Sequence, residues 1–165
     1  MEETYIISTL VENKPGVLQK VSSMFRSRGF NIESISVGPI QSNDISRMTI
    51  TIKGDERTVD QLIKQLRKLI DVIEVNLLDP KRTVYRELAL IKVECKDSNS
   101  RNDIVSFSNI YRAKIVDVTR DSIMVEITGT PDKIDSFIQL LKGYGIMELA
   151  RTGVTALARG DLNGK

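Results

Sequence analysis

The feature that most constrains this chain is an internal repeat, because two copies of one pattern predict two domains of the same fold. An alternating, strand-like segment runs to Gly54, and a similar segment runs to Gly129, 75 positions later. An amphipathic helix is predicted after each, and its apolar positions agree at the same offset. The matched pairs are Val59 with Ile134, Leu62 with Phe137, Ile63 with Ile138 and Leu66 with Leu141. We therefore expect two copies of one unit.

The first copy predicts the order βαββαβ, the ferredoxin-like arrangement. Strands are predicted at residues 5–11, 32–37, 48–53 and 71–77, where β-forming residues alternate with polar ones. Between the first two strands, a helix face formed by Val17, Leu18, Val21, Met24 and Phe25 is predicted to end at Gly29. The apolar face of the second helix is predicted to extend to Ile70. Its start is predicted either as a capping box of Thr58 and Gln61 or as a cap at Asp55.

The second copy is predicted after a linker at residues 79–84, because Pro80 removes a ladder donor between two strand patterns. Strands are expected at residues 86–95, 114–118, 123–128 and 146–151, with helices around residues 102–112 and from Pro131. Apolar residues at positions 153–159 predict a further short element, and residues 160–165 are expected to be a frayed tail. The predicted fold class is α+β, with two tandem ferredoxin-like domains over residues 1–78 and 85–159.

Composition excludes several kinds of site. The chain has no histidine, so a Ser-His-Asp site, a Cys-His site and a His-ligated metal site are impossible. Cys95 is the single cysteine, which excludes an internal disulfide and a cysteine-rich metal site and indicates a cytoplasmic protein. We assign no catalytic residue, no metal site and no cofactor to this chain.

Charge and hydropathy also limit the partners. The 24 basic and 22 acidic residues are interspersed and sum to a net charge of +2, so no basic stripe for nucleic acid is predicted. No apolar run approaches the ~18 residues that a membrane-spanning helix needs. The acidic start, Met1-Glu2-Glu3, is unlike a signal peptide. We expect neither nucleic acid nor a membrane as partner.

The turn at residues 13–18 is the best candidate for a ligand site. N–H groups at a helix start lack helical acceptors and lie at the positive end of the dipole, so they suit a carboxylate. Gly16 would let a ligand approach the backbone, and Asn13 offers a donor and an acceptor. The alternative is structural, because Pro-Gly is a common turn and asparagine a common cap. For Asn31, too, a turn role is the alternative.

These runs also carry a family resemblance. Asn13-Lys14-Pro15-Gly16-Val17-Leu18, followed by Arg28-Gly29-Phe30-Asn31-Ile32, resembles the N-terminal half of an ACT domain, a βαββαβ module that binds amino acids. The wider chain resembles the small regulatory subunit family of acetolactate synthase (acetohydroxyacid synthase). The runs that resemble this family are residues 29–35, 46–50, 54–56, 86–93, 115–119 and 150–154. The resemblance covers essentially the whole chain.

The resemblance implies a non-catalytic regulatory subunit of branched-chain amino-acid biosynthesis. Its implied partners are a second copy of this chain and a catalytic large subunit, which would hold thiamine diphosphate, Mg and FAD. It also implies activation of that subunit and feedback inhibition by valine, bound between two protomers of the ACT domain. The implied valine-binding residues are Asn13, Lys14, Pro15, Gly16, Val17 and Leu18 from one protomer, with Asn31 and Ile32 from the other.

Other interpretations remain open. A free-standing ACT-type sensor could regulate some other enzyme, although the second domain would then have no clear use. An RNA-binding ferredoxin-like fold is disfavoured, because Phe, Tyr and Trp make up only 5% of the chain and offer few stacking platforms. Independent catalysis lacks a convergent acid, base and nucleophile. The second domain has Lys96-Asp97-Ser98-Asn99 in place of the Asn-Lys-Pro-Gly turn, so we predict no valine site there.

Overall fold

The computed structural model describes residues 3–160, which form two compact units. The first unit comprises the chain up to Tyr85 and then the residues from Gly153 onward. The second is Arg86–Thr152. Residues 153–159, which the sequence pattern assigned to the second domain, therefore lie in the first unit. The frayed tail expected at 160–165 falls, beyond Gly160, outside the described residues.

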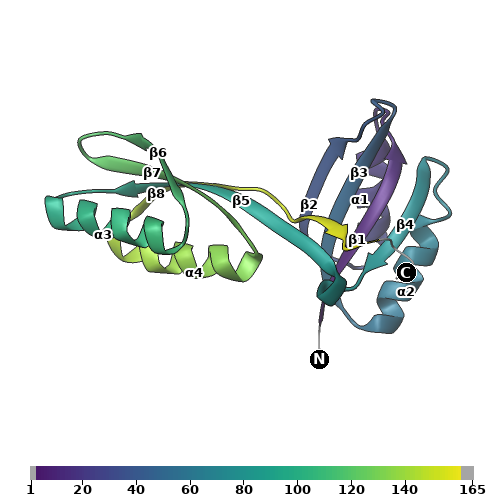
Figure 1. Ribbon diagram of the computed structural model, residues 1–165. Coiled ribbons are helices and arrows are strands. Elements are labelled where there is room, and N and C mark those ends of the chain that lie inside the picture. The colour runs from purple at the N-terminus through teal and green to yellow at the C-terminus, as the bar shows by residue number, and fades with distance from the viewer. Residues whose placement is uncertain (1–2, 161–165) are drawn as a thin grey trace. The chain divides into compact units, whose positions relative to one another are not determined.

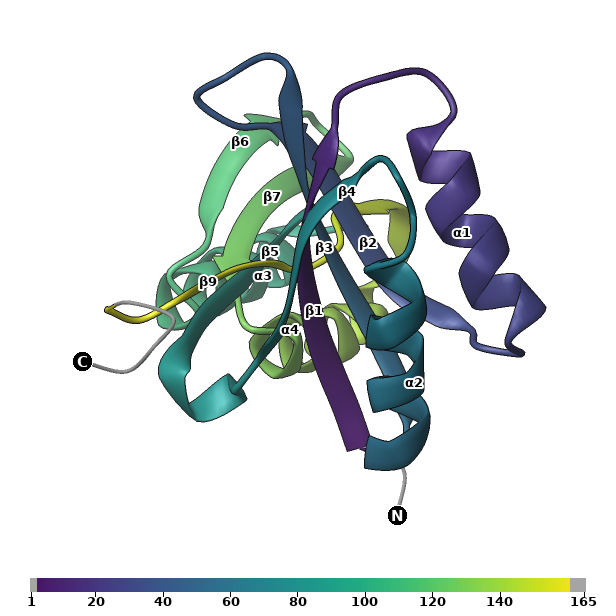
Figure 2. The ribbon, with the colours of Figure 1, turned by 90° about the vertical axis from the view of Figure 1, so that its right-hand side faces the viewer.

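The first unit has the predicted βαββαβ order. Its elements are β1 (Glu3–Glu12), α1 (Val17–Ser27), β2 (Ile32–Pro39), β3 (Ile45–Gly54), α2 (Glu56–Leu66) and β4 (Val72–Leu78). The strands form an antiparallel sheet in the order β2-β3-β1-β4, so β2 and β4 are its edges. Both helices pack on one face of this sheet (Figures 1 and 2). We call the other face the open face.

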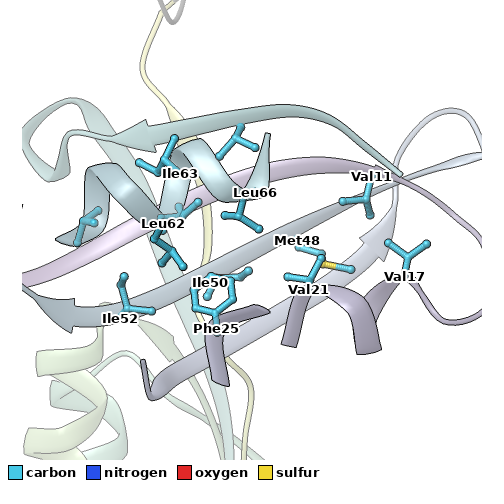
Figure 3. Packing of buried hydrophobic residues seen from close by; sticks show 13 residues of the cluster. Val11, Val17, Val21, Phe25, Met48, Ile50, Ile52, Leu62, Ile63 and Leu66 are labelled. Carbon is cyan, nitrogen blue, oxygen red and sulfur yellow. The ribbon is translucent and has the colours of Figure 1, made fainter. Parts of the chain in front are cut away.

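The core of the first unit lies between its helices and its sheet. Figure 3 shows the side chains of α1 and α2 converging on the strands, with Phe25, Ile50 and Leu66 among the fully buried residues. The prediction that Ile70 continues the apolar face of α2 is wrong, because the helix ends at Leu66 and the Ile70 side chain is 90% exposed.

Asp55 caps α2. Its Oδ1 accepts a hydrogen bond of 2.9 Å from the Thr58 N–H, and its Oδ2 accepts one of 2.7 Å from the Thr58 hydroxyl. Of the two predicted starts, the Asp55 cap is therefore the one that forms, since Thr58 acts as its donor. These hydrogen bonds to the ionised carboxylate lower the pKa of Asp55.

The second unit repeats the first. Its elements are β5 (Thr83–Glu94), α3 (Ser98–Ile110), β6 (Lys114–Val118), β7 (Ser122–Gly129), α4 (Pro131–Leu141) and β8 (Ile146–Arg151), with short 3-10 helices at Pro80–Arg82 and Lys142–Tyr144. The sheet order β6-β7-β5-β8 matches that of the first unit, strand for strand. Both ends of α4 lie 75 positions after those of α2, and the matched apolar residues are buried in both helices. The predicted repeat and fold class are confirmed.

Two boundaries differ from the prediction. The helix expected around residues 102–112 begins at Ser98, because Asp97 accepts a hydrogen bond of 2.7 Å from the Ser100 N–H and so caps it earlier. The linker expected at residues 79–84 already contains a 3-10 helix and the first residues of β5. Within residues 3–160, no helix is long and apolar enough to cross a membrane.

Residues 153–158, which we call the return segment, lie on the open face of the first sheet (yellow in Figure 1, β9 in Figure 2). The predicted short element is present as β9 (Thr155–Ala158), which pairs with β5. Val154 and Ala156 are each 3% exposed and pack with Ile6 and Leu78 in a small apolar cluster. The open face is thus partly covered by the return segment.

Candidate functional site

The turn at residues 13–18, which we call the Gly16 turn, leads from β1 into α1. Gly16 is the N-cap of α1 and has φ 85° and ψ −10°, a left-handed conformation that favours glycine. Within residues 3–160, no side-chain hydrogen bond caps the start of this helix. A Cβ placed on Gly16 would meet nothing within 4 Å, so the space beside this backbone is open. The Val17 N–H donates to the Lys14 carbonyl at 3.4 Å, so the N–H groups of the exposed residues Leu18 and Gln19 are the ones that could donate to a small anion.

Asn13 fixes this turn to the loop between β2 and β3. Its backbone N–H donates to the carbonyl of Asp44 at 2.8 Å, and its side-chain Nδ2 donates to the carbonyl of Asn43 at 2.7 Å. No local spacing predicts the contact, because the two segments lie about 30 positions apart. Since Nδ2 is committed to the loop, Oδ1 is the group with which Asn13 can accept a hydrogen bond from a ligand.

Two lysines near the turn are each paired with an acid. Lys14 Nζ lies 2.7 Å from Glu12 Oε2, and this hydrogen bond raises the pKa of Lys14. Lys20 Nζ lies 2.7 Å from Asp71 Oδ2, and this hydrogen bond lowers the pKa of Asp71. The paired side chains largely cancel one another, so the positive potential at the turn comes chiefly from the backbone N–H groups.

The predicted residues of the turn differ in exposure. Val17 is 3% exposed and packs in the core of the first unit, so only its backbone can contact a ligand. The Leu18 side chain is 46% exposed and offers apolar surface beside the turn. Asn13, Lys14, Pro15 and Gly16 are all exposed.

Asn31 and Ile32 lie at the other end of α1. The eleven residues of α1 separate them from Gly16, a length of about 16 Å at 1.5 Å per residue. Asn31 lines a cavity of about 340 Å³, whose other polar walls include Lys53 and Asp55. Ile32 is partly buried against the core. One chain does not bring the two groups of predicted residues together.

β2 offers a pairing edge beside these groups. It is the first strand in the order β2-β3-β1-β4, so one side of its backbone has no partner strand within the described chain. Ile32 begins β2, and the loop that holds Asn13 follows its last residue, Pro39. The two halves of the candidate site therefore lie at opposite ends of one open edge.

Both units of the chain match known protein families and known proteins. The family profile described as "AHAS small subunit-like ACT domain" matches residues 7–74, and "Small subunit of acetolactate synthase" matches residues 86–160. A probable acetolactate synthase small subunit of Methanothermobacter thermautotrophicus is 53% identical over 96% of this chain and 95% of its own length. The acetolactate synthase small subunit of Mycolicibacterium smegmatis is 46% identical over 95% of this chain and 92% of its own length. The crystal structure of the small subunit from Thermotoga maritima superposes with a TM-score of 0.90, at 42% identity, over 97% of this chain and 99% of that one.

Proposed function

Because the chain belongs to the family of acetolactate synthase small subunits, we propose that it regulates the catalytic large subunit by binding valine between two copies of its first unit. The family assignment implies the large subunit as partner. The observation that carries the proposed site is the Gly16 turn, where a helix start without a side-chain cap adjoins open space.

The chemistry of an amino acid fits this turn. The α-carboxylate would accept from the N–H groups of the first turn of α1, with Gly16 permitting close approach. The ammonium group would donate to Asn13 Oδ1. The exposed Leu18 side chain and Ile32 of the second copy would contact the isopropyl group. Pro15 restricts the turn before ligand binding, which lowers the entropy lost on binding.

The open edge of β2 supports a two-copy site. A two-fold axis that pairs two β2 edges antiparallel places the start of one strand beside the end of the other. The Gly16 turn of one copy would then approach Asn31 and Ile32 of the second copy, and each dimer would have two such sites. A parallel pairing would instead bring the two Gly16 turns together and leave Asn31 of both copies remote from them.

In this proposal the chain holds no cofactor and does no chemistry. Thiamine diphosphate, Mg and FAD belong to the large subunit, which the chain activates in the cytoplasm and renders sensitive to valine in branched-chain amino-acid biosynthesis. A free-standing amino-acid sensor is less well supported. The relatives match over both units, and they are described as subunits of one enzyme.

Calorimetric titration of the purified chain with valine, leucine and isoleucine tests the ligand, with the large subunit assayed in parallel. We expect saturable valine binding, a higher turnover of the large subunit when the chain is added, and lower turnover when valine follows. A chain that activates the large subunit but binds no valine would contradict the proposed effector. A chain that forms acetolactate alone would contradict the proposed role.

A further inference from the structure

We infer that the return segment, through Gly153 and Val154, transmits the state of the β2 half of the valine site to the second unit. This inference rests on the proposed valine site. It assigns a positioning role to residues that the site itself does not contain. The observations that carry it are a backbone contact at Gly153, a β-bulge in β2, and a pair of hydrogen bonds at Thr152.

The contact at Gly153 is made with the backbone of β2. A Cβ added to Gly153 would lie 2.6 Å from the carbonyl oxygen of Ile35, 2.7 Å from its carbonyl carbon and 2.9 Å from its nitrogen. These distances are shorter than real Cβ atoms show, and the atoms belong to a strand that cannot yield as a flexible side chain would. Glycine is therefore required here by close approach, and a small shift of β2 at Ile35 must move Gly153 or open the contact.

A bulge connects this contact to the valine site. Ile32 pairs with Ile52 but Ser34 pairs with Thr51, so Glu33 is an extra residue in β2. A bulge re-aims the side chains that follow it. Ile32 consequently faces the helices and the core, whereas Ser34 faces the open face, where its Oγ lies 2.6 Å from Thr51 Oγ1. Without the bulge, both side chains would face the same way.

Ser34 then holds the return segment directly. Its Oγ accepts a hydrogen bond of 3.3 Å from the Val154 N–H, next to the close approach at Gly153. The Val154 side chain is buried in the cluster with Ile6 and Leu78. The proposed ligand contacts at Asn31 and Ile32 thus lie two to four positions before Ser34 and Ile35, which contact the return segment.

On the other side of Gly153, the chain is fixed in the second unit. The Thr152 N–H donates to the Leu88 carbonyl at 2.9 Å, and the Leu88 N–H donates to Thr152 Oγ1 at 2.9 Å. Thr152 directly follows β8 and is covalently bonded to Gly153. One peptide bond therefore joins Thr152, which is hydrogen-bonded to β5, to Gly153, which contacts β2.

The Gly153→Ala variant tests this inference in the complex reconstituted with the large subunit. We expect it to activate the large subunit and to bind valine with a Kd within about threefold of the unsubstituted chain. Saturating valine should reduce turnover in this variant by an amount at least about fivefold smaller than in the unsubstituted chain. A factor of about five is the lower end of typical allosteric coupling. Gly143→Ala is the matched control, since a Cβ there meets nothing within 4 Å and Gly143 has no positive φ. It should behave like the unsubstituted chain.

Val154→Ala provides a second variant that leaves the Gly153 contact unblocked but weakens the anchor beside it, in case Gly153→Ala does not fold. It should show the same separation of binding from inhibition. Full valine inhibition in both folded variants would overturn the inference, as would a loss of valine binding that accounts for the lost inhibition. If the unsubstituted chain itself bound no valine, the proposed effector would fail, which is a distinguishable result.

Discussion

Replacing Gly16 with aspartate tests the proposed carboxylate site most directly. The new carboxylate would stand where the N–H groups of α1 are proposed to hold the carboxylate of valine, and the two like charges would repel. Losing one charge-assisted hydrogen bond costs about 1.5–3 kcal/mol. That loss corresponds to a roughly 10- to 150-fold weaker affinity for valine.

The structure also indicates how much this substitution should destabilise the folded state. At φ 85° a side chain carries backbone strain of roughly 1–2 kcal/mol, but its Cβ meets nothing within 4 Å. That strain is a minor part of the ~5–15 kcal/mol by which domains are usually stable. The variant should therefore fold and still activate the large subunit.

Gly16→Ala is the matched control, because it adds the same strain without the charge. We expect it to weaken valine binding by about threefold or less, under ~1 kcal/mol. The assay is turnover of the reconstituted complex against valine concentration, with calorimetry of each chain alone. Unchanged inhibition in Gly16→Asp would place the carboxylate site elsewhere. Equal losses in both variants would show that backbone conformation, and not charge, controls binding.

Phe25→Ala should lower the free energy of unfolding of the first unit by about 3–5 kcal/mol in urea titrations, because it removes a fully buried ring from the core. Asp55→Ala should lower the melting temperature above about pH 4, where the unfolded carboxyl is also ionised. Because the folded pKa of Asp55 is lowered by Thr58, the difference should shrink as pH falls through that pKa; a difference constant down to pH 2 would argue against this cap. Val37→Asp, on the open edge strand β2, should shift the chain from dimer to monomer in sedimentation, whereas Val116→Asp on the corresponding strand β6, with similar exposure of 48% against 46%, should not. Equal effects at both positions would refute dimerisation through β2.

The elements that could be predicted from the sequence are those in which apolar residues recur at a regular spacing within the element itself. The apolar faces of α2 and α4 follow from residues three or four positions apart, and the strands follow from residues two positions apart. The start of α3 was missed because the apolar pattern begins late, whereas the helix is set by the cap at Asp97. Ile70 was misassigned because its spacing fits a helix that ends one turn earlier, at Leu66.

The candidate site was less predictable. The turn at Gly16 could be found from Pro-Gly before an amphipathic segment, and its positive φ agrees with the choice of glycine. The hydrogen bonds of Asn13 to the loop at residues 43 and 44 depend on tertiary structure, so no local pattern reveals them. The same holds for the close approach of Gly153 to Ile35, because the two residues lie 118 positions apart in the sequence. The family resemblance implies valine as the ligand, whereas the spacing of residues along the sequence does not.

The return of residues 153–158 to the first unit has a consequence for synthesis on the ribosome. The first unit is discontinuous in sequence, so the apolar surface around Ile6 and Leu78 cannot be covered until the whole second unit has been translated. At about 5–20 residues per second, that interval is roughly 3 to 13 s. During it the nascent chain exposes an apolar patch on an otherwise folded sheet, which is a site for chaperone binding or for association between neighbouring nascent chains. A stop codon just before Gly153 would make that exposure permanent, so such a truncation should reduce the yield of folded protein although β1 to β8 are all encoded.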